Sequence, residues 1–195
     1  MDNIFTVVST IITGAIALIG IYLKISLNKK CDPVAEQNAI DQNVMAALEY
    51  LRNELDADRI IVQEFHNGGK FTSGCSQKKL SISYEVCNRG VSSIFRKFQN
   101  VRVSALSSIL KRSFNNLILV NLNKEECAFS HDLKEHGTIS SAFCVLKTLT
   151  NKNIGLLSIQ YVNRPKHKFT EQQNKCIQVQ RRIISGYLVS HKLKT

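Results

Sequence analysis

The segment His66-Asn67-Gly68-Gly69-Lys70 contains the residue types best suited to binding an anion. Glycines let backbone N–H groups approach an anion closely, and a lysine supplies a compensating charge. The spacing matches neither a P-loop nor a dinucleotide-binding fingerprint. Asn-Gly is also the strongest short-range signal for a β-hairpin turn. The segment therefore has two interpretations, a ligand site and a turn, and the turn is the simpler one.

Cys127 and His131 are four residues apart, a spacing that places two metal ligands on one helical face. His136 follows nearby, but no further cysteine or histidine cluster completes a four-ligand set, so we expect no metal site. The six cysteines form no Cys-x-x-Cys pair, and none lies in the signature of a cysteine nucleophile. The glutamates form no recognisable acid–base pair. We therefore expect neither a cofactor nor enzymatic activity.

The residues from 34 to 56 show a helical period with one apolar face. Four of the apolar residues, Ile40, Val44, Ala47 and Leu51, also have the spacing of a short coiled-coil seam. The face therefore fits packing on the domain that follows, a parallel dimer contact, or both. The apolar positions are Val34, Ile40, Val44, Ala47, Leu48, Leu51 and Leu55.

Alternating apolar patterns and turn residues predict an α+β domain after this helix. The order is helix, strand, strand, short helices, strand, helix, strand hairpin, helix. Consecutive hairpins flanked by helices indicate a central, mainly antiparallel sheet that the first and last helices cover on one face. Thr170 and Gln173 form a capping-box pattern at the start of the last helix. The expected strands are 59–65, 79–86, 117–122, 139–149 and 154–162, and the expected helices are 92–98, 105–112, 125–135 and one from Thr170 onward.

An N-terminal run of residues, 4–23, contains no charged side chain. About twenty apolar residues in a helix span the roughly 30 Å hydrocarbon core of a bilayer. A cleaved signal peptide is the alternative, but no basic residue precedes the run. The sequence therefore predicts a transmembrane helix at 4–27, a juxtamembrane connector helix at 28–56 and a globular domain at 57–195, whose first helix begins near residue 34.

Small and hydroxylated residues recur at every fourth position along this N-terminal segment. Such spacing lets helix backbones approach closely and form interhelical hydrogen bonds in a bilayer. We therefore expect the chain to form homo-oligomers through this helix. The expected helix-association face is formed by Thr6, Thr10 and Gly14 together with Ser9, Thr13 and Ala17.

The chain of 195 residues has a formal net charge of +11, which favours anionic partners. The basic residues are mostly scattered and no DNA- or RNA-binding motif accompanies them, so we expect no nucleic acid partner. Beside a lipid bilayer, anionic headgroups are the better match. Lys24, Lys29 and Lys30 follow the apolar run, and the positive-inside rule then places the globular domain in the cytoplasm.

The end of the chain resembles a GAF domain. In that family a strand that opens on a glycine leads through a loop to a last helix with an aromatic residue before it. The matching residues here are 155–164, Gly-Leu-Leu-Ser-Ile-Gln-Tyr-Val-Asn-Arg, followed by Phe169. The resemblance covers roughly residues 34–190. It implies a GAF-like antiparallel sheet flanked by helices and specifies no activity.

The chain also resembles the holin family of the T-even bacteriophages, which has one N-terminal span, a globular domain and a closing strand hairpin and helix. That family carries one cysteine on a late strand and one on the last helix, and Cys144 and Cys176 occupy the matching positions. A Tyr-x-Asn-Arg turn at 161–164 extends the match. The family's longer cytoplasmic N-terminal segment is missing, and residues 66–69 have no clear counterpart.

The holin resemblance implies a homo-oligomer in the bacterial host's inner membrane that permeabilises the membrane and times host lysis, with an antiholin-type regulator as a partner. It also implies a periplasmic domain, against the positive-inside rule, and a Cys144–Cys176 disulfide if that compartment is oxidising. The alternative is a membrane-anchored GAF-like sensor or ligand-binding domain that signals through the helix at 34–56 and a partner protein. The lack of an output module in the chain favours the holin.

Overall fold

The computed structural model describes residues 32–192. The predicted membrane span at 4–27 lies outside the described residues, and so do the helix-association face expected on it and Cys31. Within residues 32–192, no helix combines the length and the apolar character needed to cross a bilayer. The residues from Ala39 onward form one compact unit, which includes all but the first residues of helix α2 (Pro33–Leu55).

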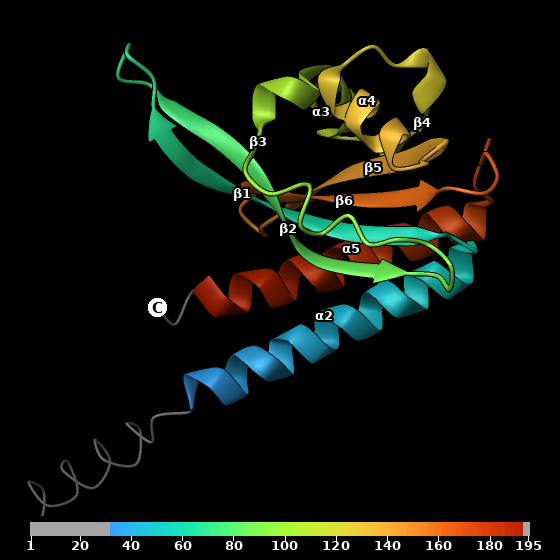
Figure 1. Ribbon diagram of the computed structural model, residues 1–195. Coiled ribbons are helices and arrows are strands. Elements are labelled where there is room, and N and C mark those ends of the chain that lie inside the picture. The colour runs from blue at the N-terminus through green and yellow to red at the C-terminus, as the bar shows by residue number, and fades with distance from the viewer. Residues whose placement is uncertain (1–31, 193–195) are drawn as a thin grey trace, which may run out of the picture. The chain divides into compact units, whose positions relative to one another are not determined.

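A six-stranded antiparallel sheet forms the centre of this unit, as Figure 1 shows. The strand order is β3-β2-β1-β6-β5-β4, so the first long strand pairs with the last one. The first and last long strands of the domain, β1 and β6, therefore lie side by side in the middle of the sheet. The strands are β1 (Arg59–Lys70), β2 (Ser76–Cys87), β3 (Val101–Arg102), β4 (Ile118–Asn121), β5 (Ser140–Lys147) and β6 (Asn153–Tyr161).

Helices α2 and α5 (Glu171–Lys192) cover one face of the sheet (Figure 1). The apolar face predicted for the first helix is used here, because Val44, Leu48 and Leu51 are fully buried against the sheet. The predicted capping box is confirmed: the Gln173 amide donates to the Thr170 hydroxyl, and the Gln173 side chain accepts from the Thr170 amide. We call the buried apolar residues between these two helices and the sheet, such as Val44, Leu48 and Leu51, the helix-side core.

The second face of the sheet is also covered, by short helices that include α3 (Ser107–Ser113) and α4 (Ala128–Glu135). From the sequence, the first and last helices were expected on one face, and no cover was assigned to the other. The helix expected at 92–98 is wrong: this segment consists of turns and irregular structure, held down by the buried Ile94 and Phe98. Phe98, Phe129 and Phe143 pack in contact with one another. They fill the space between the sheet and the short helices, which we call the short-helix core.

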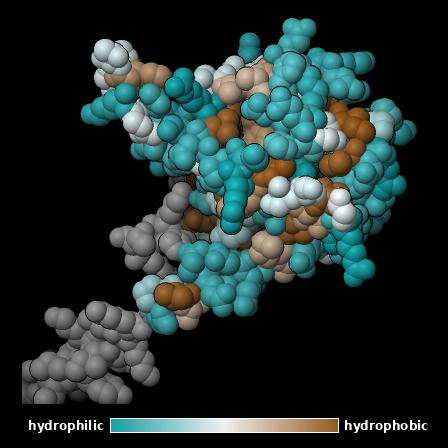
Figure 2. Space-filling view, in the orientation of Figure 1, coloured by the Kyte–Doolittle hydropathy of each residue, from teal (hydrophilic) through white to brown (hydrophobic). Residues whose placement is uncertain are grey.

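Strands β1 and β2 continue beyond the rest of the sheet as a projecting hairpin (Figure 1). Its surface is mostly hydrophilic (Figure 2). The turn closes at residues 71–75, where the Phe71 amide donates to the Cys75 carbonyl and Gly74 has φ +80°. The interpretation of residues 66–69 as the turn is therefore wrong. That segment lies inside β1, and the pairing with β2 becomes irregular between Asn67 and Lys70.

Candidate functional site

The sheet opens between β1 and β6, two neighbouring strands. Their pairing ends at Glu64 and Gly155, after which β1 runs on into the projecting hairpin and β6 has only two further residues. At Gly155 the two strands approach so closely that a β-carbon would collide with the Gln63 carbonyl oxygen. A glycine is therefore required where the two strands begin to separate.

An open cleft of about 660 Å³ lies at this separation. Phe65, Val103 and Leu110 contribute from the short-helix core, whereas Ile154 and Val189 belong to the helix-side core. The cleft therefore lies between the two cores, and its volume is in the range of small-molecule sites. The lining comprises Phe65, His66, Asn67, Lys78, Val103, Leu110, Phe114, Thr148, Lys152, Asn153, Ile154 and Val189.

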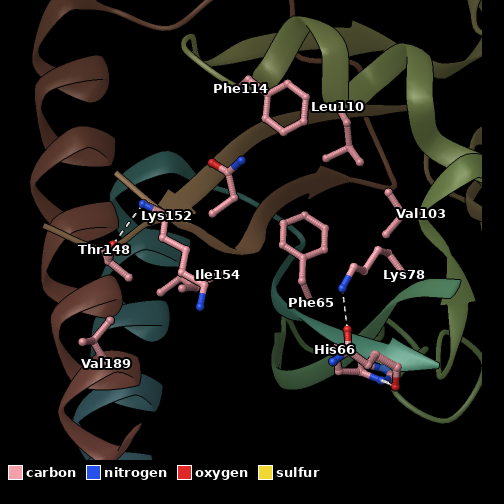
Figure 3. A pocket seen from close by; sticks show the side chains of 12 residues that line it. Phe65, His66, Lys78, Val103, Leu110, Phe114, Thr148, Lys152, Ile154 and Val189 are labelled. Atoms are coloured by element: carbon pink, nitrogen blue, oxygen red, sulfur yellow. Dashed lines mark hydrogen bonds between the residues drawn. The ribbon is translucent and has the colours of Figure 1, made fainter. Parts of the chain in front are cut away.

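Apolar side chains dominate the walls of the cleft. Figure 3 shows Phe65, Phe114 and Ile154 around one hollow, with Lys152 on one side and Lys78 on the other. Phe114, at the end of α3, is 37% exposed, which is a large exposure for a phenylalanine beside a core. Exposed apolar surface in a concave site is typical of a place where a ligand removes it from water.

The polar side chains of the cleft are held in place by their neighbours. Lys78 Nζ donates to Asn67 Oδ1 at 2.6 Å, across the β1–β2 pair. His66 Nε2 lies 2.8 Å from the Ser81 hydroxyl. On the opposite side, the Lys152 amide donates to the Thr148 hydroxyl and so fixes the β5–β6 turn. The Lys78 ammonium is therefore held in place by a hydrogen bond, whereas for Lys152 the bond fixes the backbone of the turn.

Part of this site lies in the segment 66–70, for which the sequence left a ligand site open. His66 and Asn67 line the cleft, but Gly68, Gly69 and Lys70 do not. Gly68 packs against the aliphatic part of the Lys79 side chain, which would have to shift to admit a β-carbon. Lys70 is exposed at the end of β1. The apolar residues that the analysis missed come from five separate elements, and none of them has a local signal that distinguishes it from a core residue.

The two cysteines matched to the holin family, Cys144 and Cys176, are free thiols in the structure. Cys144 is fully buried in the helix-side core, where burial raises its pKa to about 12, and Arg181 is its charged neighbour. The pKa of Cys176 is also raised, first by burial and then by the Glu54 carboxylate, and its thiol contacts Tyr50. The two thiols therefore have different surroundings.

Cys127 and His131, whose spacing was considered for metal binding and for which no metal site is expected, lie at the start of α4. Cys127 is the residue before α4, and His131 is exposed on its first turns. His136 packs edge-on against Phe98 in the short-helix core. Among residues 32–192, no group of three or more histidine, cysteine or acidic side chains is placed to hold a metal ion.

Comparison with known proteins finds similarity in structure alone. No protein-family model and no curated protein matches the sequence. A domain assigned to a two-component sensor histidine kinase of Sinorhizobium meliloti matches with a TM-score of 0.54 and 18% identity, over 75% of this chain and 88% of that one. A GAF domain from Synechocystis, in its photoproduct state, matches with a TM-score of 0.59 and 13% identity, over 81% and 96%.

A third similar structure is the phycocyanobilin-bound GAF domain of a cyanobacterial phytochrome, with a TM-score of 0.58, 13% identity and coverage of 80% and 87%. The first of these three structures is assigned to a sensor histidine kinase and the other two are GAF domains, and none of the three is a holin. The interpretation as a bacteriophage holin that forms membrane lesions and times host lysis is therefore wrong. The closing hairpin and helix on which it was based belong to the GAF fold as well. The described residues have the α+β fold of GAF domains, with a curled antiparallel sheet between two layers of helices.

Proposed function

We propose that this chain is a sensory ligand-binding domain whose ligand occupies the cleft between β1 and β6. The observation that carries the proposal is the position of the cleft between the two cores. A ligand there contacts the short helices through Leu110 and Phe114 and the long helix α5 through Val189. Binding and a change in α5 are therefore coupled through direct contact.

The similar structures support a ligand-binding role. Among them are a sensor histidine kinase domain and a GAF domain with bound phycocyanobilin. In this chain the interior between the sheet and the short helices is filled by Phe98, Phe129 and Phe143. The cleft at the open side of the sheet is therefore the better candidate for a ligand. A partner protein that contacts α5 would receive the signal.

A matched pair of substitutions on α5 tests the site. Val189→Trp fills the cleft from the α5 wall, whereas Val179→Trp adds the same ring to an exposed position on the same helix, outside the lining. The probe is phenylnaphthylamine, an uncharged dye that fluoresces in apolar sites, added to the full chain. Because both variants retain the same N-terminal residues, any binding of dye to that segment cancels in the comparison.

We expect Val189→Trp to weaken dye binding by about tenfold or more, which corresponds to about 1.4 kcal/mol, and Val179→Trp to leave it unchanged. Val103→Trp, which fills the opposite wall, gives a second blocking variant. Hydrogen exchange should slow on dye binding in the amides around Val189. Equal binding by all three variants, or no binding by the parent chain, would contradict the proposal.

A further inference from the structure

The charged residues of the cleft all have the same sign. Lys78 and Lys152 are both exposed at the mouth, and no aspartate or glutamate is among the lining residues. The acidic residue next to this part of β1 is Glu64, whose carboxylate accepts a hydrogen bond from Ser83 on β2. It is not part of the lining. Lysine side chains are cationic at neutral pH, so the mouth presents positive charge without a compensating carboxylate of its own.

The geometry also fixes where one of the two charges lies. The Lys78 ammonium is held 2.6 Å from the Asn67 amide oxygen, a neutral partner that orients the ammonium group but leaves its charge uncompensated. Two of its three hydrogen-bond donors remain for a ligand. Lys152 extends from the β5–β6 turn on the other side of the hollow (Figure 3). The mouth therefore carries one lysine from the β1–β2 pair and one from the β5–β6 turn.

The rest of the cleft has a different chemistry. Phe65, Leu110, Phe114, Ile154 and Val189 form apolar walls behind the lysines. A small inorganic anion would leave these walls exposed to water, and an uncharged hydrocarbon would leave the lysines unused. We propose, on the basis of the ligand-binding function above, that the cleft selects amphipathic anions, with an apolar aromatic or aliphatic body in the hollow and a carboxylate, sulfonate or phosphate group between Lys78 and Lys152.

Two dyes that differ in one anionic group provide the test. Anilinonaphthalene sulfonate has the same ring system as phenylnaphthylamine with a sulfonate added, and both are titrated against the full chain. We expect the parent chain to prefer the sulfonate. The double variant Lys78→Gln/Lys152→Gln should lower the preference for the sulfonate over the uncharged dye, measured as the ratio of the two dissociation constants, by about fivefold or more. The control Lys124→Gln removes an exposed lysine outside the lining and should leave this ratio unchanged.

The outcomes separate this inference from the function on which it rests. If the uncharged dye binds and is blocked by Val189→Trp, but the sulfonate gains nothing from the lysines, the anion preference is wrong and the binding site stands. If Lys124→Gln lowers the preference for the sulfonate as much as the double variant does, the general positive charge of the chain attracts the dye, and the inference is again wrong. If neither dye binds, both proposals fail.

Discussion

The two ends of β1 differ in the interactions that surround them. At its first residues, which we call the closed end, buried charges join β1 to β2, β6 and two loops. At its last residues, which we call the open end, β1 has left β6, and the cleft separates it from the β5–β6 turn. One strand therefore belongs both to the most tightly bonded part of the domain and to the part with space for a ligand.

Arg59 is the centre of the closed end and is 1% exposed. Its guanidinium donates to the Gln160 side chain at 2.7 Å and to the Ser92 carbonyl at 2.6 Å, and it lies 3.4 Å from the Glu85 carboxylate. Beside it, Asp58 accepts hydrogen bonds from the amides of the β6–α5 loop at 2.6 and 3.0 Å. Within the described part of the chain, Arg59 Nε has no hydrogen-bond partner, and its contact with Glu85 is an ion pair alone. Buried charges that are paired in this way resist local opening, because any opening leaves a charge without a partner.

The difference between the two ends of β1 allows the domain to keep a fixed strand register while the contacts around the cleft rearrange. The strand register is fixed at the closed end by directional bonds between charged groups. The open end has mainly apolar and single hydrogen-bonded contacts, which are less specific in geometry and less costly to rearrange. A ligand can therefore move the open end without disturbing the strand register. Because Val189 of α5 lines the cleft, we expect this movement to shift α5 while the rest of the sheet stays in place.

Removing the guanidinium of the closed end should have the largest effect on stability. Arg59→Met keeps most of the side-chain volume but leaves the Glu85 carboxylate, which is 4% exposed, without its cationic partner. We expect the free energy of unfolding to fall by about 3 to 5 kcal/mol. Urea denaturation followed by circular dichroism measures it.

The double variant Arg59→Met/Glu85→Gln serves as the control for this prediction. Because the glutamine is neutral, it should recover part of the loss, and a full recovery would assign the whole effect to the unpaired charge. A loss below about 1 kcal/mol in the single variant would mean that the ion pair contributes no more than a surface pair, and the contrast between the two ends would disappear.

Gly155→Ala tests the boundary between the two ends. Its new β-carbon would meet the Gln63 carbonyl oxygen, so β1 and β6 must separate. We expect a loss of about 1 to 3 kcal/mol and faster hydrogen exchange at Glu64 and Phe65, with the closed end unaffected.

The matched control for this substitution is Gly186→Ala on α5, where a β-carbon meets no atom within 4 Å. Alanine has the higher helix propensity, so this change should stabilise the domain by roughly 0.5 to 1 kcal/mol. If both substitutions are neutral, the close approach at Gly155 does not hold the strands in register, and the cleft is not bounded there.

Much of the fold could be predicted from the sequence because its signals are local. The first helix was placed at 34–56 and begins and ends within one residue of that range. The capping box located the start of α5. The cover on the second face was not predicted, although β5 contains the unbroken apolar run 142–146, which is typical of a strand buried on both sides.

The site was less accessible to sequence analysis. Pairing of β1 with β6 joins residues about a hundred positions apart, and no local pattern states which strands are neighbours. The cleft depends on where that pairing stops. His66 and Asn67 attracted attention through their types, but Phe114 and Val189 look like ordinary core residues in the sequence. The turn was placed five or six residues too early because the strand tolerates the Asn-Gly pair as an irregularity.

The smallest expected effect is a difference in thiol reactivity between two cysteines, one just before β2 and one at its last residue. It tests the difference in rigidity between the two ends of β1 without a change in stability. Cys75 is exposed at the hairpin turn, whereas Cys87 is half-buried at the closed end. Burial raises the pKa of Cys87, and the Glu85 carboxylate raises it further, so less of its thiolate is present at pH 8.

We expect iodoacetamide to modify Cys75 about tenfold faster or more, as measured by mass spectrometry of the peptides, and the rate at Cys87 to keep rising at higher pH. In urea the two rates should converge. Equal rates in the folded protein would mean that the closed end opens as readily as the hairpin tip, and the two ends of β1 would then differ in shape but not in rigidity.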